Sequence, residues 1–155
     1  MKKNNLLLFF AISGFFFSCS SDDNSYQVKF NEAEFTQQRE LWKENNLSNY
    51  SYQYDYFASS GPFEINVLVE NGIAIGDSDY ADAKTIDEVF NKIQSDYQDA
   101  LNQDKNGIKG VQITVSYNKE FHYPEKIYYS TSYKGDSPLG GAYYELEIKN
   151  FTPNN

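Results

Sequence analysis

Strict alternation of tyrosine with polar residues runs through YSYQYDY, residues 50–56. Side chains of a strand point to opposite faces in turn, so the tyrosines are expected to share one face of a strand. They are Tyr50, Tyr52, Tyr54 and Tyr56. Because tyrosine favours strands, the stretch predicts a sheet with an aromatic face.

Further strands are expected on the C-terminal side of this stretch. Four segments alternate apolar with polar residues, the pattern of half-buried strands. They are 65–69, 111–117, 127–133 and 144–148. The pair Asn71-Gly72 is typical of a tight hairpin, so residues 73–76 are expected to return antiparallel to the preceding strand.

Two segments carry helix signals. Asn31, with Glu34 three residues later, predicts an N-cap for a helix that reaches about Asn45. Thr85 and Glu88 have the spacing of a capping box. Behind it, apolar residues recur at helical spacing and predict an amphipathic helix. They are Ile86, Val89, Phe90, Ile93, Tyr97, Ala100 and Leu101.

The expected order of elements is α-β-β-β-α-β-β-β. Two helices with one apolar stripe each cannot enclose a core alone, but they can do so on a sheet. We therefore predict an α+β fold in two layers, with both helices packed on one face of a mostly antiparallel sheet. One such domain is expected over residues 30–152, followed by a tail at 153–155.

The N-terminus has the order of a bacterial lipoprotein signal peptide, residues 1–18. Lys2 and Lys3 precede a largely apolar run of twelve residues, 6–17, which is too short to cross a bilayer. The Ser18-Cys19 pair that follows resembles a lipobox, which implies lipidation of Cys19. The alternative is ordinary secretion with a free thiol. A lone cysteine forms no internal disulfide, and an exposed free thiol is a liability in an oxidising compartment. Acylation removes that thiol, which favours lipidation.

Residues 19–29 are expected to form the lipidated cysteine and a flexible polar tether. Its Asp22-Asp23 pair is either a surface-export signal or part of a solvated spacer. We expect a lipid-anchored protein of the bacterial cell envelope, held at the outer membrane and facing the periplasm or the cell surface.

The chain is acidic, with a formal net charge of −9 that becomes −11 when Lys2 and Lys3 are removed with the signal peptide. Phosphate backbones repel such a chain, so no nucleic acid is expected as a partner. Anionic lipid headgroups should also repel it, which leaves the acyl group as the anchor.

Catalytic residues are scarce. His122 is the single histidine, and no motif supplies the orienting partner that a general base needs. Nucleophile-elbow, phosphate-loop and dinucleotide motifs are absent from the sequence. We therefore expect no enzymatic activity and no cofactor; the alternative is a hydrolytic role.

Calcium is a second alternative. Residues 77–82 with Glu88 resemble the spacing of a calcium loop, but Ala81 occupies a ligand position and Glu88 belongs to the capping box. Residues 102–107 match the start of such a loop, yet Ile113 stands where the bidentate acid belongs. No metal site is expected.

Tyrosines are the best candidates for binding. The tyrosines of residues 50–56 either present an aromatic platform or lie in the core beneath the helices. Tyr128 and Tyr143 point away from the apolar faces of their strands, which indicates exposed contacts. We expect a non-enzymatic binding or accessory module whose partner is an envelope protein, a peptide or a glycan.

Several strings resemble the domain-of-unknown-function family 6174, over about Phe35 to Phe151. They are Leu41-Trp42, Asn49 to Tyr54, Thr85 to Phe90 and Tyr123 to Ile127. The resemblance implies a secreted or lipid-anchored protein and brings no established activity. Many members have cysteines after the tyrosine strand, where this chain has Ala58-Ser59-Ser60, so no disulfide is carried over.

Overall fold

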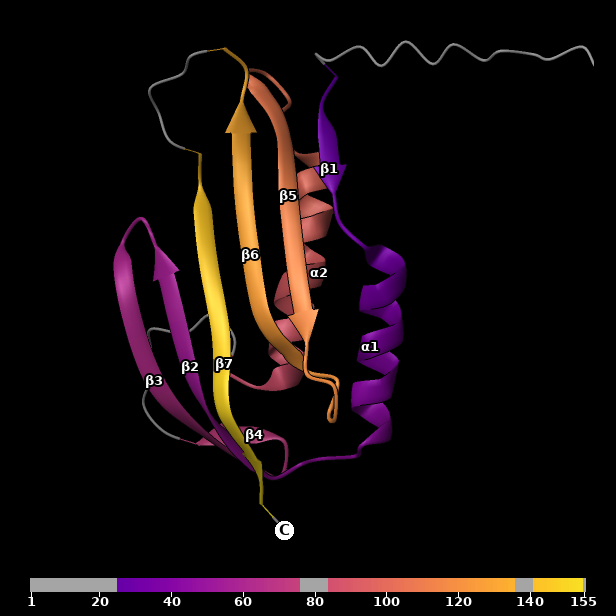
Figure 1. The fold of residues 1–155 in the computed structure, drawn as a ribbon, viewed down its shortest axis with the longest axis vertical. Coiled ribbons are helices and arrows are strands. Elements are labelled where there is room, and N and C mark those ends of the chain that lie inside the picture. The colour runs from indigo at the N-terminus through magenta and orange to yellow at the C-terminus, as the bar shows by residue number, and fades with distance from the viewer. Residues whose placement is uncertain (1–24, 76–83, 136–140, 155) are drawn as a thin grey trace, which may run out of the picture.

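Strands dominate the fold in the computed structural model, which describes residues 25–75, 84–135 and 141–154. The strands form one sheet in the order β1-β5-β6-β7-β2-β3-β4 (Figure 1). The elements in chain order are β1 (Gln27–Lys29), α1 (Glu32–Glu44), β2 (Tyr50–Ala58), β3 (Gly61–Glu70), β4 (Ile73–Ile75), α2 (Ile86–Asn102), β5 (Ile108–Tyr117), β6 (Pro124–Tyr133) and β7 (Tyr143–Pro153).

The expected two-layer layout with the order α-β-β-β-α-β-β-β is wrong. A strand, β1, precedes the first helix and pairs in parallel with β5, so the sheet is mixed. Of the described residues, 48 % lie in strands and 26 % in helices, so strands are the larger part of the fold. β1 has three residues, too few for alternation to show, and it shortens the expected tether because residues 27–29 belong to the sheet.

β1 lies close to β5 because Gly110 has no side chain. Gln27 pairs with Gly110, and a Cβ there would lie 2.4 Å from the backbone oxygen of Gln27. The neighbouring Tyr26 hydroxyl donates a hydrogen bond to the carbonyl of Ala100, and the Gln103 amide donates one to the Tyr26 hydroxyl at 2.6 Å. The start of the described chain is therefore fixed both to the sheet and to the end of α2.

The capping box predicted for α2 is confirmed. The Thr85 hydroxyl accepts from the Glu88 N–H at 3.1 Å, and the Glu88 carboxylate accepts from the Thr85 N–H at 2.7 Å. Burial alone would raise the pKa of Glu88, but the hydrogen bonds from Thr85 and Lys84 outweigh it and lower the pKa. Most of the apolar stripe of α2 is buried, but Leu101 at its end is exposed and Tyr97 is half-buried. Figure 1 shows the helix behind β5 and β6.

The first helix begins as predicted. The Asn31 side chain accepts from the Glu34 N–H at 3.3 Å. Phe35 and Trp42, one face of α1, are buried. The ring of Phe35 lies 5.8 Å from that of Phe90 in α2, centroid to centroid. α1 therefore packs against α2 through aromatic rings.

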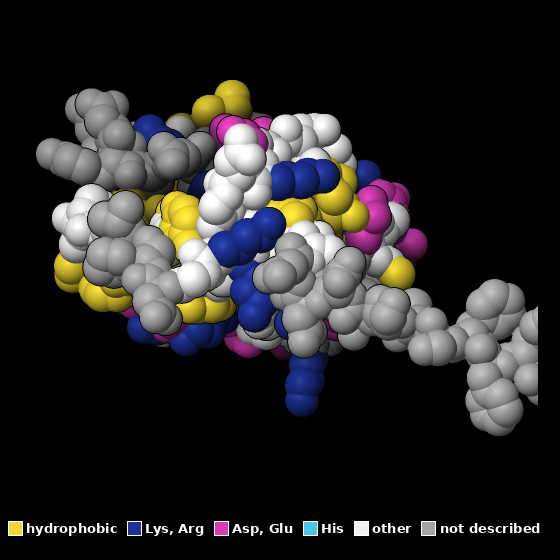
Figure 2. Space-filling model, turned by 90° about the horizontal axis from the view of Figure 1, so that it is seen from above, with side chains coloured by type: hydrophobic (Ala, Val, Ile, Leu, Met, Phe, Trp, Pro, Cys, Tyr) yellow, Lys and Arg dark blue, Asp and Glu magenta, His cyan; other side chains and the backbone are white. Residues whose placement is uncertain are grey.

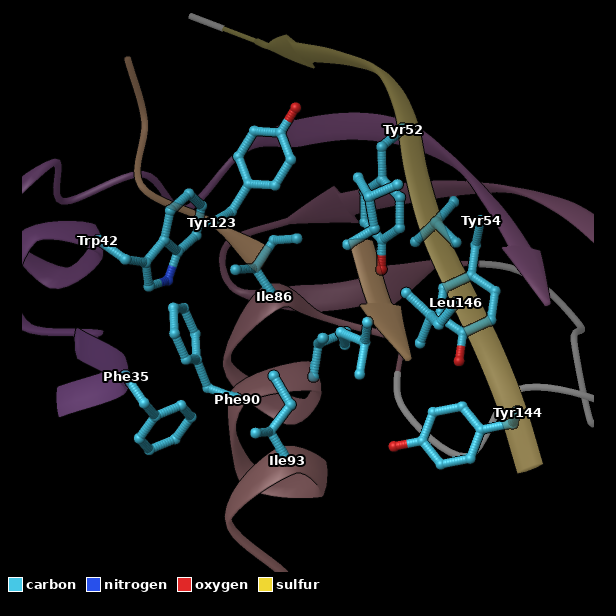
Figure 3. Close-up of a cluster of buried hydrophobic side chains, with 14 of the residues drawn as sticks. Phe35, Trp42, Tyr52, Tyr54, Ile86, Phe90, Ile93, Tyr123, Tyr144 and Leu146 are labelled. Atoms are coloured by element: carbon cyan, nitrogen blue, oxygen red, sulfur yellow. The ribbon is translucent and has the colours of Figure 1, made fainter. Parts of the chain in front are cut away.

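Side-chain alternation gives the sheet a buried face and an open face. Tyr50, Tyr52 and Tyr54 of β2 and Leu146 and Ile148 of β7 are buried in the core. Figure 3 shows Tyr52, Tyr54 and Leu146 among the other core side chains. The hairpin predicted from Asn71-Gly72 is confirmed, with both residues at positive φ between β3 and β4. Residues between the buried ones point to the other face of the same strands.

Candidate functional site

The open face of β3, β2 and β7 carries a row of carboxylates. Asp55 of β2 is paired with Glu64 of β3 on one side and with Glu147 of β7 on the other. Like charges directly opposite each other in a sheet are destabilising. The sheet therefore holds three acidic groups next to one another. Packing of the fold does not explain why they are adjacent.

One lysine partly neutralises this row, and a second neutralises the neighbouring Glu145. Lys149 lies 2.6 Å from the Asp55 carboxylate and 3.2 Å from that of Glu147. Its hydrogen bonds to those two carboxylates raise its pKa. Lys126 of β6 pairs with Glu145 at 2.5 Å. These ion pairs keep carboxylates and ammonium groups in a fixed array on a surface open to solvent.

Aromatic rings lie beside the carboxylates. Phe57 is 46 % exposed and Tyr143 is 38 % exposed, although both side chains are large and apolar. Their ring centroids are 5.9 Å apart. In the register of the sheet, Phe57 is paired with Pro62 on β3 and Glu145 on β7. Apolar and acidic side chains thus occupy neighbouring positions.

A shallow depression of about 440 Å³ is lined by both the carboxylates and the aromatic side chains. It is lined by Asp55, Tyr56, Phe57, Pro62, Phe63, Glu64, Glu145 and Glu147. We call this region the acidic–aromatic depression. Its six open-face residues come from β2, β3 and β7 and are positioned by strand register, so the site is part of the rigid sheet.

Two tyrosines singled out from the sequence lie on the open face. Tyr128 of β6 is 39 % exposed and is paired with Glu145, so it continues the row that holds Phe57. Tyr143 contacts Phe57 directly. Sequence reasoning missed Phe57 and Pro62 themselves. Phe57 follows Tyr56, so the alternation of residues 50–56 already placed it opposite the tyrosines.

Three of the four tyrosines of residues 50–56 lie in the core, which was the second of the two alternatives. Tyr50, Tyr52 and Tyr54 are at most 2 % exposed, so they offer no surface to a ligand here. The Tyr50 hydroxyl accepts from the Ile86 N–H at 3.0 Å, and burial raises the Tyr50 pKa to about 12. Tyr56 is half-buried between the rings of its strand neighbours.

Another polar group ties α2 to β7. The Tyr144 hydroxyl donates to the Asp96 carboxylate, and Lys92 lies 3.3 Å from the same carboxylate. The Lys92 ammonium also lies 4.5 Å from the centre of the Tyr144 ring. Burial, followed by the charge of Asp96, raises the pKa of Tyr144. The three side chains form hydrogen bonds and ion pairs with one another, so we interpret them as a structural link between α2 and β7.

Other candidate groups are dispersed. His122 has positive φ, and its Nδ1 lies 3.0 Å from the Gln38 side-chain oxygen. The Asp104 carboxylate accepts from the Asn106 N–H within its own turn. Across the described residues, no group of three His, Cys, Asp or Glu side chains could hold a metal ion. The calcium candidate at 77–82 lies outside the described residues.

Comparison with known families adds one result. The Family of unknown function (DUF6174) matches residues 34–134. The chain belongs to this family. Searches of curated proteins and of solved structures give no significant match. The family match includes β2, β3 and β6 and stops before β7, short of the span to Phe151 that we expected. It therefore contains Phe57 and Glu64 of the depression but not Glu145 or Glu147.

The segment expected to carry the anchor, residues 1–24 with Cys19, lies outside the described residues. Within the described part of the chain, no helix is long and apolar enough to span a membrane.

Proposed function

We propose that this protein is a lipid-anchored component of the bacterial cell envelope that binds a basic polypeptide through its open sheet face and catalyses no reaction. The anchor would be Cys19, at the end of a short apolar run that follows two lysines. More than one acyl chain is needed for stable attachment, and each buried methylene contributes about 0.8 kcal/mol.

One observation carries the binding proposal: the acidic–aromatic depression is exposed, structured and charged. Its carboxylates, Asp55, Glu64, Glu145 and Glu147, outnumber the two ammonium groups that contact them. A partner with lysine or arginine side chains would complement this charge, and complementarity of this kind favours association and partner choice. Phe57 and Tyr143 add the aromatic area that is enriched at protein interfaces.

A non-catalytic role is supported by the arrangement of the titratable groups. His122 contacts an amide oxygen, and the acids of the depression lie on a shallow open surface. General acid–base catalysis needs a positioned partner, and transition-state stabilisation is strongest where water is excluded. A shallow, ion-paired surface suits recognition better than chemistry.

Mass spectrometry of the native protein tests the anchor. We expect a mature chain that begins at Cys19 and carries acyl groups, and a Cys19→Ser variant that is released from membranes. A retained leader or a bare thiol would contradict this part of the proposal.

Site-specific photo-crosslinking in intact cells tests the binding face. A benzophenone amino acid replaces Phe57, and a matched control replaces Gln37, an exposed residue of α1. We expect a basic protein to be captured from position 57 alone, and less of it when Glu64→Gln and Glu147→Gln are added. Capture of a glycan would show that the alternative partner class is correct. Identical products from both positions would contradict the site.

A further inference from the structure

The end of the domain where the described chain begins is rich in lysine, although the chain as a whole is acidic. Figure 2 views the molecule from that end and shows lysine side chains gathered over it. Three lysines of separate segments lie where β5 begins and β6 ends: Lys105 follows α2, Lys109 is the second residue of β5, and Lys134 follows β6. We call these residues the tether-end lysines.

Backbone pairing brings the tether-end lysines together. Ile108, at the start of β5, pairs with Tyr133, at the end of β6. The Lys134 N–H donates to the Gly107 carbonyl at 2.7 Å, and the Ile108 N–H donates to the Lys105 carbonyl at 3.3 Å. The three residues are therefore held at one end of the sheet by hydrogen bonds of the fold itself.

The first described residues, Ser25 and Tyr26, lie at the same end. Ser25 and Lys109 line one hollow, and the Lys105 ammonium lies 5.3 Å from the centre of the Tyr26 ring. Ser25 lies six residues after Cys19 in the sequence. Six extended residues span at most about 20 Å, so a lipid on Cys19 would keep this end near the bilayer.

The tether-end lysines carry charge that no carboxylate among the described residues neutralises. All three side chains are exposed, and none forms an ion pair with another described residue. Asp104, next to Lys105, accepts hydrogen bonds from Asn106. Asp136, two residues after Lys134, lies outside the described residues. The carboxylates of the acidic–aromatic depression lie on β2, β3 and β7, away from the β1–β5 edge in the strand order.

We infer that the tether-end lysines contact anionic phospholipid headgroups and hold the anchored domain with this end against the bilayer. The inference rests on the proposed lipid anchor, which supplies attachment, while the lysines supply orientation. Charges more than about 10 Å apart are largely screened at physiological salt, so the net charge of the whole chain does not decide this contact. Lysines near an anionic surface are attracted individually.

The test does not depend on natural acylation. The mature chain, residues 19–155, is made with a bare thiol and coupled through Cys19 to a maleimide lipid in vesicles. Its lysines are then acylated with a water-soluble amine reagent and mapped by mass spectrometry. Vesicles of phosphatidylcholine alone are compared with vesicles that also contain phosphatidylglycerol. Lys119, in the loop at the opposite end of β5 and β6, is the internal control.

We expect each tether-end lysine to react about fivefold more slowly on the phosphatidylglycerol vesicles, with Lys119 unchanged. Protection should vanish at about 1 M salt, where the Debye length is about 3 Å. Lys109→Gln with Lys134→Gln should remove the protection of Lys105, while the matched Lys43→Gln with Lys119→Gln should not.

Equal reaction rates on both kinds of vesicle, or protection that survives high salt, would overturn the inference. Asp22 and Asp23 are retained in this chain, so their repulsion is included in the measurement. Because coupling is chemical, this result is independent of whether native Cys19 proves to be acylated.

Discussion

Leu146 and Glu147 are neighbours in β7, yet they belong to different surfaces of the same sheet. Leu146 is fully buried, whereas Glu147 lies on the open face within 3.2 Å of Lys149. The same division holds in β2, where Tyr54 is buried and Asp55 belongs to the row of carboxylates. One face of each strand therefore carries the stability of the fold, and the other is available for recognition.

The largest difference in the free energy of unfolding is expected between substitutions at Leu146 and at Glu147. Leu146→Ala should lower the free energy of unfolding by about 2–5 kcal/mol, since it removes apolar contacts and leaves a cavity. Glu147→Ala should change it by about 0.5 kcal/mol or less, as is usual for exposed sites. Urea denaturation measures both. A comparable loss for Glu147→Ala would show that the open face also supports the fold.

The next largest effect on the free energy of unfolding is expected from high pH, which ionises tyrosines of the buried face. The pKa of Tyr50 is raised by burial to about 12, and so is that of Tyr123. A raised pKa means that the neutral phenol stabilises the fold fully below pH 10, and that this contribution is lost as pH rises through 12. For Tyr50 it is about 3 kcal/mol.

Denaturant unfolding at several pH values checks this expectation. The free energy of unfolding should fall between pH 10 and pH 12, and it should fall less steeply in Tyr50→Phe, which has no phenol to ionise. Tyr50→Phe also removes the acceptor of the Ile86 N–H, so its stability at neutral pH is the baseline for the comparison. An identical slope in the two proteins would contradict the assignment.

Comparison of the two faces shows which features could be predicted from the sequence and which could not. Alternation placed Tyr50 to Tyr54 on one face, and the spacing of Thr85 and Glu88 identified the start of α2, because both signals are local. β1 was not predicted because it is short and its partner, β5, is some eighty residues away in sequence. The row of Asp55, Glu64 and Glu147 was not predicted for a similar reason. The β2–β3 hairpin pairs Asp55 with Glu64, but Glu147 joins them only through the pairing of β7 with β2, which are far apart in sequence.

A smaller effect is expected at the junction between the buried face and α2. Thr85→Ala removes the hydroxyl that accepts from the Glu88 N–H, and loss of an N-cap costs about 1 kcal/mol. Thr85→Ser keeps the hydroxyl and is the matched control. Thermal unfolding should rank the proteins as wild type, then Thr85→Ser, then Thr85→Ala. Equal stability of the two variants would show that the cap contributes little.

The smallest effect on stability is expected from the ion pair of Lys149 and Asp55 on the open face. Both side chains are partly exposed, at 43 % and 26 %, so solvent screens their attraction. A double-mutant cycle with Lys149→Met and Asp55→Asn should give a coupling energy of about 0.2–1 kcal/mol that decreases with added salt.

Lys149→Met should nevertheless change recognition. It removes the ammonium that contacts Asp55 and Glu147 and leaves the acidic–aromatic depression more negative. A basic partner captured through Phe57 should then associate faster at low salt, because charge complementarity acts mainly on the association rate. Slower association with this variant would show that Lys149 itself contacts the partner, and the open face would then recognise an anionic group instead of a basic one.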